Sequence, residues 1–130
     1  MKTSNNLWYW LPRILAILSI GFVSLFALDA FNGNESLFAK VQDYAMHMIP
    51  SLILAGILAL SWKWERLGGS IYILLGAGLI PFIYSLNHNR NGFSAIQSLN
   101  VVLLINLPFI LVGILFWISY KFGHKTQVSK

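Results

Sequence analysis

Four apolar stretches that carry almost no charged residue are the feature that most constrains how this chain can fold. They extend over about residues 10–31, 44–62, 67–86 and 99–120. Each reaches about 20 residues, which is the length that a helix needs to cross a hydrocarbon core of roughly 30 Å. Only 10% of the 130 residues are charged, whereas a soluble domain usually carries about 25%. We therefore expect an all-α protein: one integral-membrane domain over residues 1–130 with four transmembrane helices.

The connections between these stretches predict how the four helices are arranged. They cover residues 32–43, 63–66 and 87–98, and links this short make neighbouring helices antiparallel in a four-helix bundle. Seven basic residues fall on the side of the two termini: Lys2, Arg13, Lys63, Arg66, Lys121, Lys125 and Lys130. Only Lys40 and Arg90 fall on the other side. Because Lys and Arg are enriched in cytoplasmic loops, we expect both termini in the cytoplasm and a multi-pass protein of the cytoplasmic (plasma) membrane.

The outer connection before the second span has the pattern of a short amphipathic helix. A turn signal covers residues 32–34, and Asn34 or Ser36 can cap a helix that starts there. Apolar residues then recur at helical spacing up to the second span, which contains Pro50. We expect this helix to lie on the outer surface, to run into the second span and to bend at Pro50.

A few polar residues within or near the spans are candidate functional residues. Asp29 ends the first span and His47 begins the second, at the same expected depth, so a direct hydrogen bond between them is our hypothesis. Such a pair could take up and release protons. With Asn106 and Tyr84 it would line a small polar vestibule that opens to the outer side. The alternatives are that Asp29 and His47 are ordinary residues of the headgroup layer, and that the proline kinks only improve packing.

The termini side carries a candidate ion pair. Glu65 is the only acidic residue expected there, and it stands between Lys63 and Arg66. We expect Arg13, at the start of the first span, to pair with it. The alternative is that Arg13 only anchors its helix at the membrane surface.

Several classes of site and partner do not fit the composition. Cysteine is absent, which excludes disulfides and thiolate metal sites. One histidine and one carboxylate are too few ligands for a metal, and no cofactor is expected. The basic residues are not gathered beside exposed aromatics, so nucleic acid is not an expected partner. The expected partners are the lipid bilayer and either further copies of the chain or another membrane protein.

Three stretches together resemble a known family. They are "PRILAIL…SLFALDAF", "HMIPSLIL…LSWKWERLGG" and "NLPFILVGILFW", and they resemble an uncharacterised family of small bacterial four-span membrane proteins. The resemblance covers residues 12–117. It implies the four-span topology and a bacterial inner membrane, and it implies no activity.

The leading functional hypothesis is a non-enzymatic accessory or interaction protein of the bacterial cytoplasmic membrane. The alternative is an oligomeric transporter of a small ion or solute that uses Asp29 and His47 as a proton-linked site. An enzyme that acts on lipid ranks last, because no nucleophile and base are expected at the same depth.

Overall fold

Helices make up all the regular structure in the part of the chain that the computed structural model describes, residues 3–128. The elements are α1 (Thr3–Leu25), the 3-10 helix η1 (Phe26–Phe31), α2 (Leu37–Lys63), α3 (Glu65–Gly78), α4 (Ile80–Ser85), the π-helical turn η2 (Leu86–Arg90) and α5 (Ala95–Val128). The expected all-α class is confirmed. Lys2 and Lys130, which entered the count of basic residues, lie outside the described residues, as does the side chain of Lys125.

Four of the helical stretches are long and apolar enough to cross a membrane. They are Leu7–Asp29, Leu37–Lys63, Glu65–Arg90 and Ala95–Phe122. The expected number of helices able to cross a membrane is therefore confirmed. The helices extend beyond the charge-free stretches, because a helix does not have to end where the first charged residue appears.

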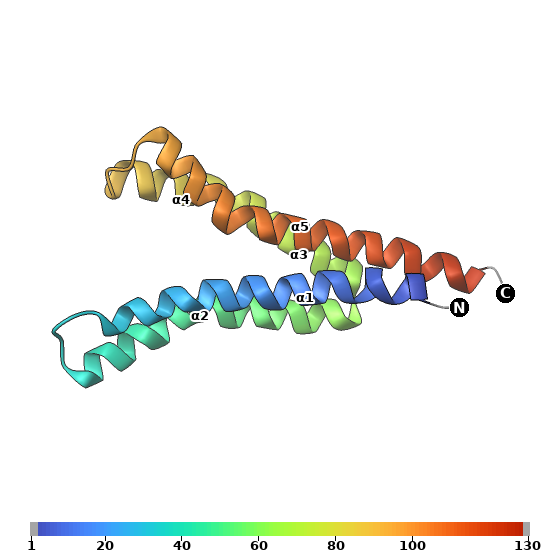
Figure 1. Ribbon diagram of the computed structural model, residues 1–130, viewed down its shortest axis with the longest axis horizontal. Coiled ribbons are helices and arrows are strands. Elements are labelled where there is room, and N and C mark those ends of the chain that lie inside the picture. Colours follow the sequence, from blue (N-terminus) through green and yellow to red (C-terminus); the bar gives the residue numbers. More distant parts are fainter. Residues whose placement is uncertain (1–2, 129–130) are drawn as a thin grey trace.

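The helices form two hairpins that meet at one end and diverge at the other (Figure 1). One hairpin is α1 with α2, and the other is α3 and α4 with α5. Both termini and the turn between α2 and α3 lie toward the end where the hairpins meet, which we call the termini end. The connections from α1 to α2 and from α4 to α5 lie at the opposite end, which we call the loop end (Figure 1).

The segment before the second span is helical, as expected, but it is not a separate helix. Ser36 caps it: its hydroxyl oxygen accepts a hydrogen bond from the backbone N–H of Ala39 at 3.4 Å. From Leu37 the helix α2 runs without interruption through Pro50 to Lys63. Leu37 and Phe38, on its first turn, are among the most exposed apolar side chains of the described part of the chain.

The third expected span, residues 67–86, lies within the helical stretch Glu65–Arg90, in which the regular α-helix changes at the expected proline. The α-helix α3 ends at Gly78, and a second, short helix, α4, begins at Ile80 with Pro81 in its first turn. Proline has no backbone N–H, and its ring collides with the carbonyl group four residues earlier, here that of Ala77. The helix is therefore interrupted at Leu79 and restarts with proline in the position that tolerates it best.

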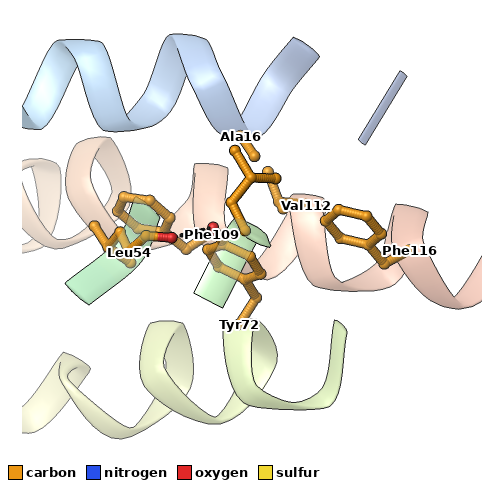
Figure 2. Packing of buried hydrophobic residues seen from close by; sticks show 7 residues of the cluster. Ala16, Leu54, Tyr72, Phe109, Val112 and Phe116 are labelled. Carbon is orange, nitrogen blue, oxygen red and sulfur yellow. Dashed lines mark hydrogen bonds between the residues drawn. The ribbon is translucent and has the colours of Figure 1, made fainter. Parts of the chain in front are cut away.

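The core lies where the four spans meet. Tyr72 of α3 is fully buried, and its ring stacks between Phe109 and Phe116 of α5, with 6.2 Å between ring centroids on each side. The Tyr72 hydroxyl donates a hydrogen bond of 2.8 Å to the backbone carbonyl of Leu54 in α2. Figure 2 shows these rings together with Ala16 of α1 and Val112 of α5. Tyr72 thus links the two hairpins through both packing and a hydrogen bond.

Glycines let α3 and α5 approach closely, and these two helices share the most extensive contact in the fold. A β-carbon built on Gly113 would lie 2.5 Å from the carbonyl oxygen of Gly69, and one built on Gly69 would lie 2.8 Å from that of Gly113. Neither position has room for a side chain, because the obstacle is backbone. Small residues at such contacts are the usual means by which helices associate in lipid.

We predict that Gly113→Ala destabilises the fold, because the added methyl group pushes α3 and α5 apart. The expected loss is about 1–3 kcal/mol, the usual cost of overpacking, measured by thermal or denaturant unfolding in detergent. Gly56→Ala is the matched control, since a β-carbon there meets nothing within 4 Å. Equal stabilities of Gly113→Ala and Gly56→Ala would contradict the close contact.

Candidate functional site

A buried ion pair joins the two hairpins at the termini end. The side chain of Arg13 in α1 is 0% exposed, and its Nη2 donates a hydrogen bond of 2.7 Å to Oε1 of Glu65 in α3, whose side chain is 18% exposed. Nη1 of Arg13 donates to the backbone carbonyl of Tyr9, one turn earlier on α1. The pairing of Arg13 with Glu65 expected from the sequence is present, and Arg13 is not merely a surface anchor.

Local structure explains why Glu65 can reach Arg13. The chain leaves α2 at Lys63, and Trp64 adopts a non-helical backbone conformation with φ −126° and ψ 77°. Glu65 is therefore the first residue of α3, where a carboxylate is favoured by the partial positive charge of the helix start. The same Oε1 also accepts a hydrogen bond of 3.1 Å from the hydroxyl of Ser119 in α5. One carboxylate oxygen thus connects α1, α3 and α5.

Aromatic rings surround the Arg13 guanidinium. Its Cζ lies 3.5 Å from the ring centroid of Tyr9, 5.4 Å from that of Phe116 and 5.8 Å from that of Trp62. The negative faces of these rings stabilise a cation that has lost its water. The sequence offered a signal only for Tyr9, which precedes Arg13 by one helical turn. Phe116 and Trp62 come from other helices, and no spacing rule identifies them.

Two further cations stand beside this pair. Nζ of Lys63 lies 4.9 Å from the centroid of the Trp64 ring, and Cζ of Arg66 lies 5.0 Å from that of Trp117. Nε1 of Trp117 donates a hydrogen bond of 3.1 Å to the hydroxyl of Ser70, which fixes the ring under Arg66. The termini end therefore combines one buried ion pair, in which Arg13 Nε has no hydrogen-bond partner among the described residues, with two cations that rest on tryptophan faces.

The expected contact between Asp29 and His47 is absent, and this hypothesis is wrong. Nδ1 of His47 lies 2.8 Å from the backbone carbonyl oxygen of Asp43 and 3.3 Å from its Oδ1. Asp29 lies in η1, where its Oδ1 accepts a hydrogen bond of 3.4 Å from the amide of Asn32. Each side chain is exposed and has found a partner within one turn of its own segment. A partner three or four residues away on the same segment is always near, whereas a contact between Asp29 and His47 depends on how their helices are rotated relative to each other.

The four residues of the expected vestibule do not come together around one cavity. Tyr84 is half-buried, and its ring stacks on His88 at 5.6 Å. Asn106 is 2% exposed, and its amide donates a hydrogen bond of 3.0 Å to the carbonyl of Val102 on its own helix. The cavity that Asn106 does line contains none of Asp29, His47 and Tyr84.

That cavity is an apolar cleft between the two hairpins. It has a volume of about 310 Å³. Its walls come from α1, α2, α3, α4, α5 and Leu79 between α3 and α4: Val23, Pro50, Ile53, Leu54, Leu75, Gly76, Leu79, Ile83, Ile105, Asn106 and Phe109. Asn106 is the one polar side chain among these lining residues. Its Oδ1 accepts no hydrogen bond from any residue in the described range.

Among the side chains that the structure describes, those of residues 7–29 and 31–122, no group of three or more His, Asp or Glu could hold a metal ion. The described residues form two features with chemical potential. One is the Arg13–Glu65 pair with its neighbouring cations, and the other is the cleft that Asn106 lines.

We predict that Glu65→Gln destabilises the protein strongly, because it leaves the buried Arg13 guanidinium without a countercharge. The expected loss is about 3 kcal/mol, at the low end for buried pairs because Glu65 is partly exposed. Arg13→Gln should cost a similar amount. The double variant should lose clearly less than the sum of the two single variants when unfolding is measured in detergent. Lys121→Gln, at an exposed cation, is the control. Additive losses would show that the two side chains do not depend on each other.

The comparisons with known proteins give a family and no activity. No curated protein and no solved structure shows a significant match to this chain. A family model described as a domain of unknown function, DUF7670, matches residues 1–129. This match covers nearly the whole chain and agrees with the resemblance to an uncharacterised family. The chain belongs to the DUF7670 family.

Proposed function

We propose that this protein is a non-enzymatic accessory protein of the bacterial cytoplasmic membrane that binds a transmembrane segment of a partner protein. It would cross the membrane four times as an antiparallel bundle, with both termini in the cytoplasm. The observation that carries the proposal is the apolar cleft between the hairpins, with the amide of Asn106 in its wall.

The position of the cleft limits what can enter it. Its lining residues lie within the four candidate spans, so the occupant comes from the hydrocarbon layer: either a lipid chain or a transmembrane helix. In lipid, helices associate through close packing and through hydrogen bonds between polar side chains. The cleft offers both, since its walls are apolar side chains that a helix can pack against and Asn106 contributes an amide.

Asn106 favours a protein over a lipid chain. An asparagine amide has two N–H donors and a carbonyl oxygen that can accept two hydrogen bonds. Only one N–H is used within the described residues, in the bond to Val102. A hydrocarbon chain offers no partner for the remaining groups, and an unsatisfied amide is costly there. A partner helix with a polar side chain at this depth satisfies them.

The transport alternative rested on a joined site of Asp29 and His47. These two side chains have partners other than each other, at Asn32 and Asp43. The cleft supports association more directly than it supports proton-linked transport.

We predict that a photoreactive phenylalanine analogue placed at Ile53 or Leu79, in the cleft wall, forms one discrete protein adduct in native membranes. The same analogue at Leu74, which is on α3 but is exposed outside the cleft wall, should give lipid adducts only. Asn106→Leu should reduce the protein adduct at least several-fold while the unfolding temperature stays close to that of the parent. Lipid adducts alone at both cleft positions would refute the proposal. An adduct with the mass of two chains would identify the partner as a second copy.

We predict that the loop end faces the outside. The chain has no cysteine, so each introduced cysteine is the only reactive thiol. Asn34→Cys and Asn91→Cys should react with a membrane-impermeant maleimide in intact spheroplasts. Lys121→Cys should react only after the membrane is permeabilised. The reverse labelling pattern would place the termini outside.

A further inference from the structure

A second cleft, at the termini end, is built from cationic and aromatic side chains. It has a volume of about 720 Å³. Its lining residues are Tyr9, Arg13, Trp62, Lys63, Trp64, Glu65, Arg66, Leu67, Ser70 and Tyr120. Four of these ten are tryptophan or tyrosine and three are cationic. This composition differs from that of the cleft around Asn106, which contains no charged side chain.

The charges of this second cleft are not balanced. Three cationic side chains face one carboxylate, which leaves two positive charges in excess. Glu65 forms no ion pair with Lys63 or Arg66; its carboxylate pairs with Arg13 at 2.7 Å and accepts from Ser119 at 3.1 Å. Within the described range, Lys63 and Arg66 contact tryptophan rings and form no ion pair. The cleft therefore presents two uncompensated cations to whatever enters it.

Backbone groups add to this positive potential. The helix α3 starts at Glu65, and no side chain caps its first turn. The first N–H groups of a helix lack partners within the helix and favour an anion. Since Glu65, Arg66 and Leu67 line the cleft, this helix start and the two cations act on the same space.

The position of the cleft identifies the source of the anion. Lys63 ends the second candidate span and Glu65 begins the third, so the cleft lies at the level where hydrocarbon gives way to headgroups. Tryptophan and tyrosine are enriched at this level, because their rings are apolar and their N–H or O–H groups are polar. The anion that is abundant at this depth is the phosphodiester of a phospholipid.

We propose that this cleft binds the headgroup of an anionic phospholipid, with Lys63 and Arg66 as the phosphate ligands. The rings of Trp64 and Tyr9 form its apolar walls next to the glycerol and the first methylene groups. Arg13 acts as a positioning residue: by holding Glu65, it prevents this carboxylate from neutralising Lys63 and Arg66. The proposal does not depend on a partner in the cleft around Asn106.

The test uses the full chain purified in detergent and native mass spectrometry of the lipid that it retains. Phosphatidylglycerol and phosphatidylcholine of equal chain length are the two probes. We expect at least a tenfold preference for phosphatidylglycerol, because two uncompensated cations at the membrane surface attract its net negative headgroup. Lys63→Gln with Arg66→Gln should remove this preference. Lys40→Gln with Arg90→Gln, which deletes one lysine and one arginine outside the cleft, should leave it within about twofold.

Three results would overturn the proposal. Equal retention of the two lipids would show that the cleft does not select an anionic headgroup. An equal loss in both double variants would show that the preference follows the overall charge of the protein. Displacement of the lipid by millimolar inorganic phosphate would show that the cleft binds a soluble phosphate instead.

The role of Arg13 is tested in the same assay. Arg13→Gln should weaken retention of phosphatidylglycerol, because the freed Glu65 can then pair with Lys63 or Arg66. Arg13→Gln combined with Glu65→Gln should restore retention, since the competing carboxylate is gone. Circular dichroism verifies that each variant is folded. If the double variant binds no better than Arg13→Gln, the positioning role of Arg13 is wrong.

Discussion

Burial of the Arg13 charge is the constraint on which the termini end of this structure depends. A guanidinium that has lost all its water is expensive inside a membrane protein unless other groups replace that water. Here the replacements are Oε1 of Glu65, the carbonyl of Tyr9 and the faces of three aromatic rings. These groups belong to all four spans. The charge is satisfied only where those helices meet, so the pair fixes which of their faces point inward.

The same constraint explains why the bundle is closed at one end and open at the other. In lipid the hydrophobic effect does not drive helices together, and association relies on close packing and hydrogen bonds. The Arg13–Glu65 pair lies at the termini end, and the backbone contact of Gly69 with Gly113 lies one helical turn further into α3. Toward the loop end the chain offers polar side chains that bond within their own segment, such as His47 to Asp43. Nothing comparable holds the hairpins together there, and they diverge (Figure 1).

The sequence predicted those features that follow from local composition. The four spans follow from apolar length, and the Arg13–Glu65 pair follows from the scarcity of acidic residues on the termini side. The prediction that Asp29 contacts His47 was wrong, because residues at equal depth in the membrane can face in different directions when their helices are rotated relative to each other. Asp43, one turn before His47, was visible in the sequence as a nearer partner. The irregularity at Leu79 follows from Pro81, as expected, whereas no sequence signal identified the rings of Trp62 and Phe116 around Arg13.

The buried polar side chains of the spans differ in how completely their own helix can satisfy them. A serine hydroxyl has one donor, and it can give it to the carbonyl four residues earlier, as Ser19 gives to Leu15 and Ser61 to Ile57. Asn106 also donates a hydrogen bond to the carbonyl four residues earlier, that of Val102. Its amide has a second N–H donor and a carbonyl oxygen, however, and its own helix supplies no partner for these groups. Ser19 and Ser61 are thus satisfied within their own helices, whereas the hydroxyls of the buried Ser51 and Ser98 have no hydrogen-bond partner in the described part of the chain. An asparagine in the wall of an apolar cleft retains unused hydrogen-bonding capacity, which is the property that a transmembrane partner can recognise.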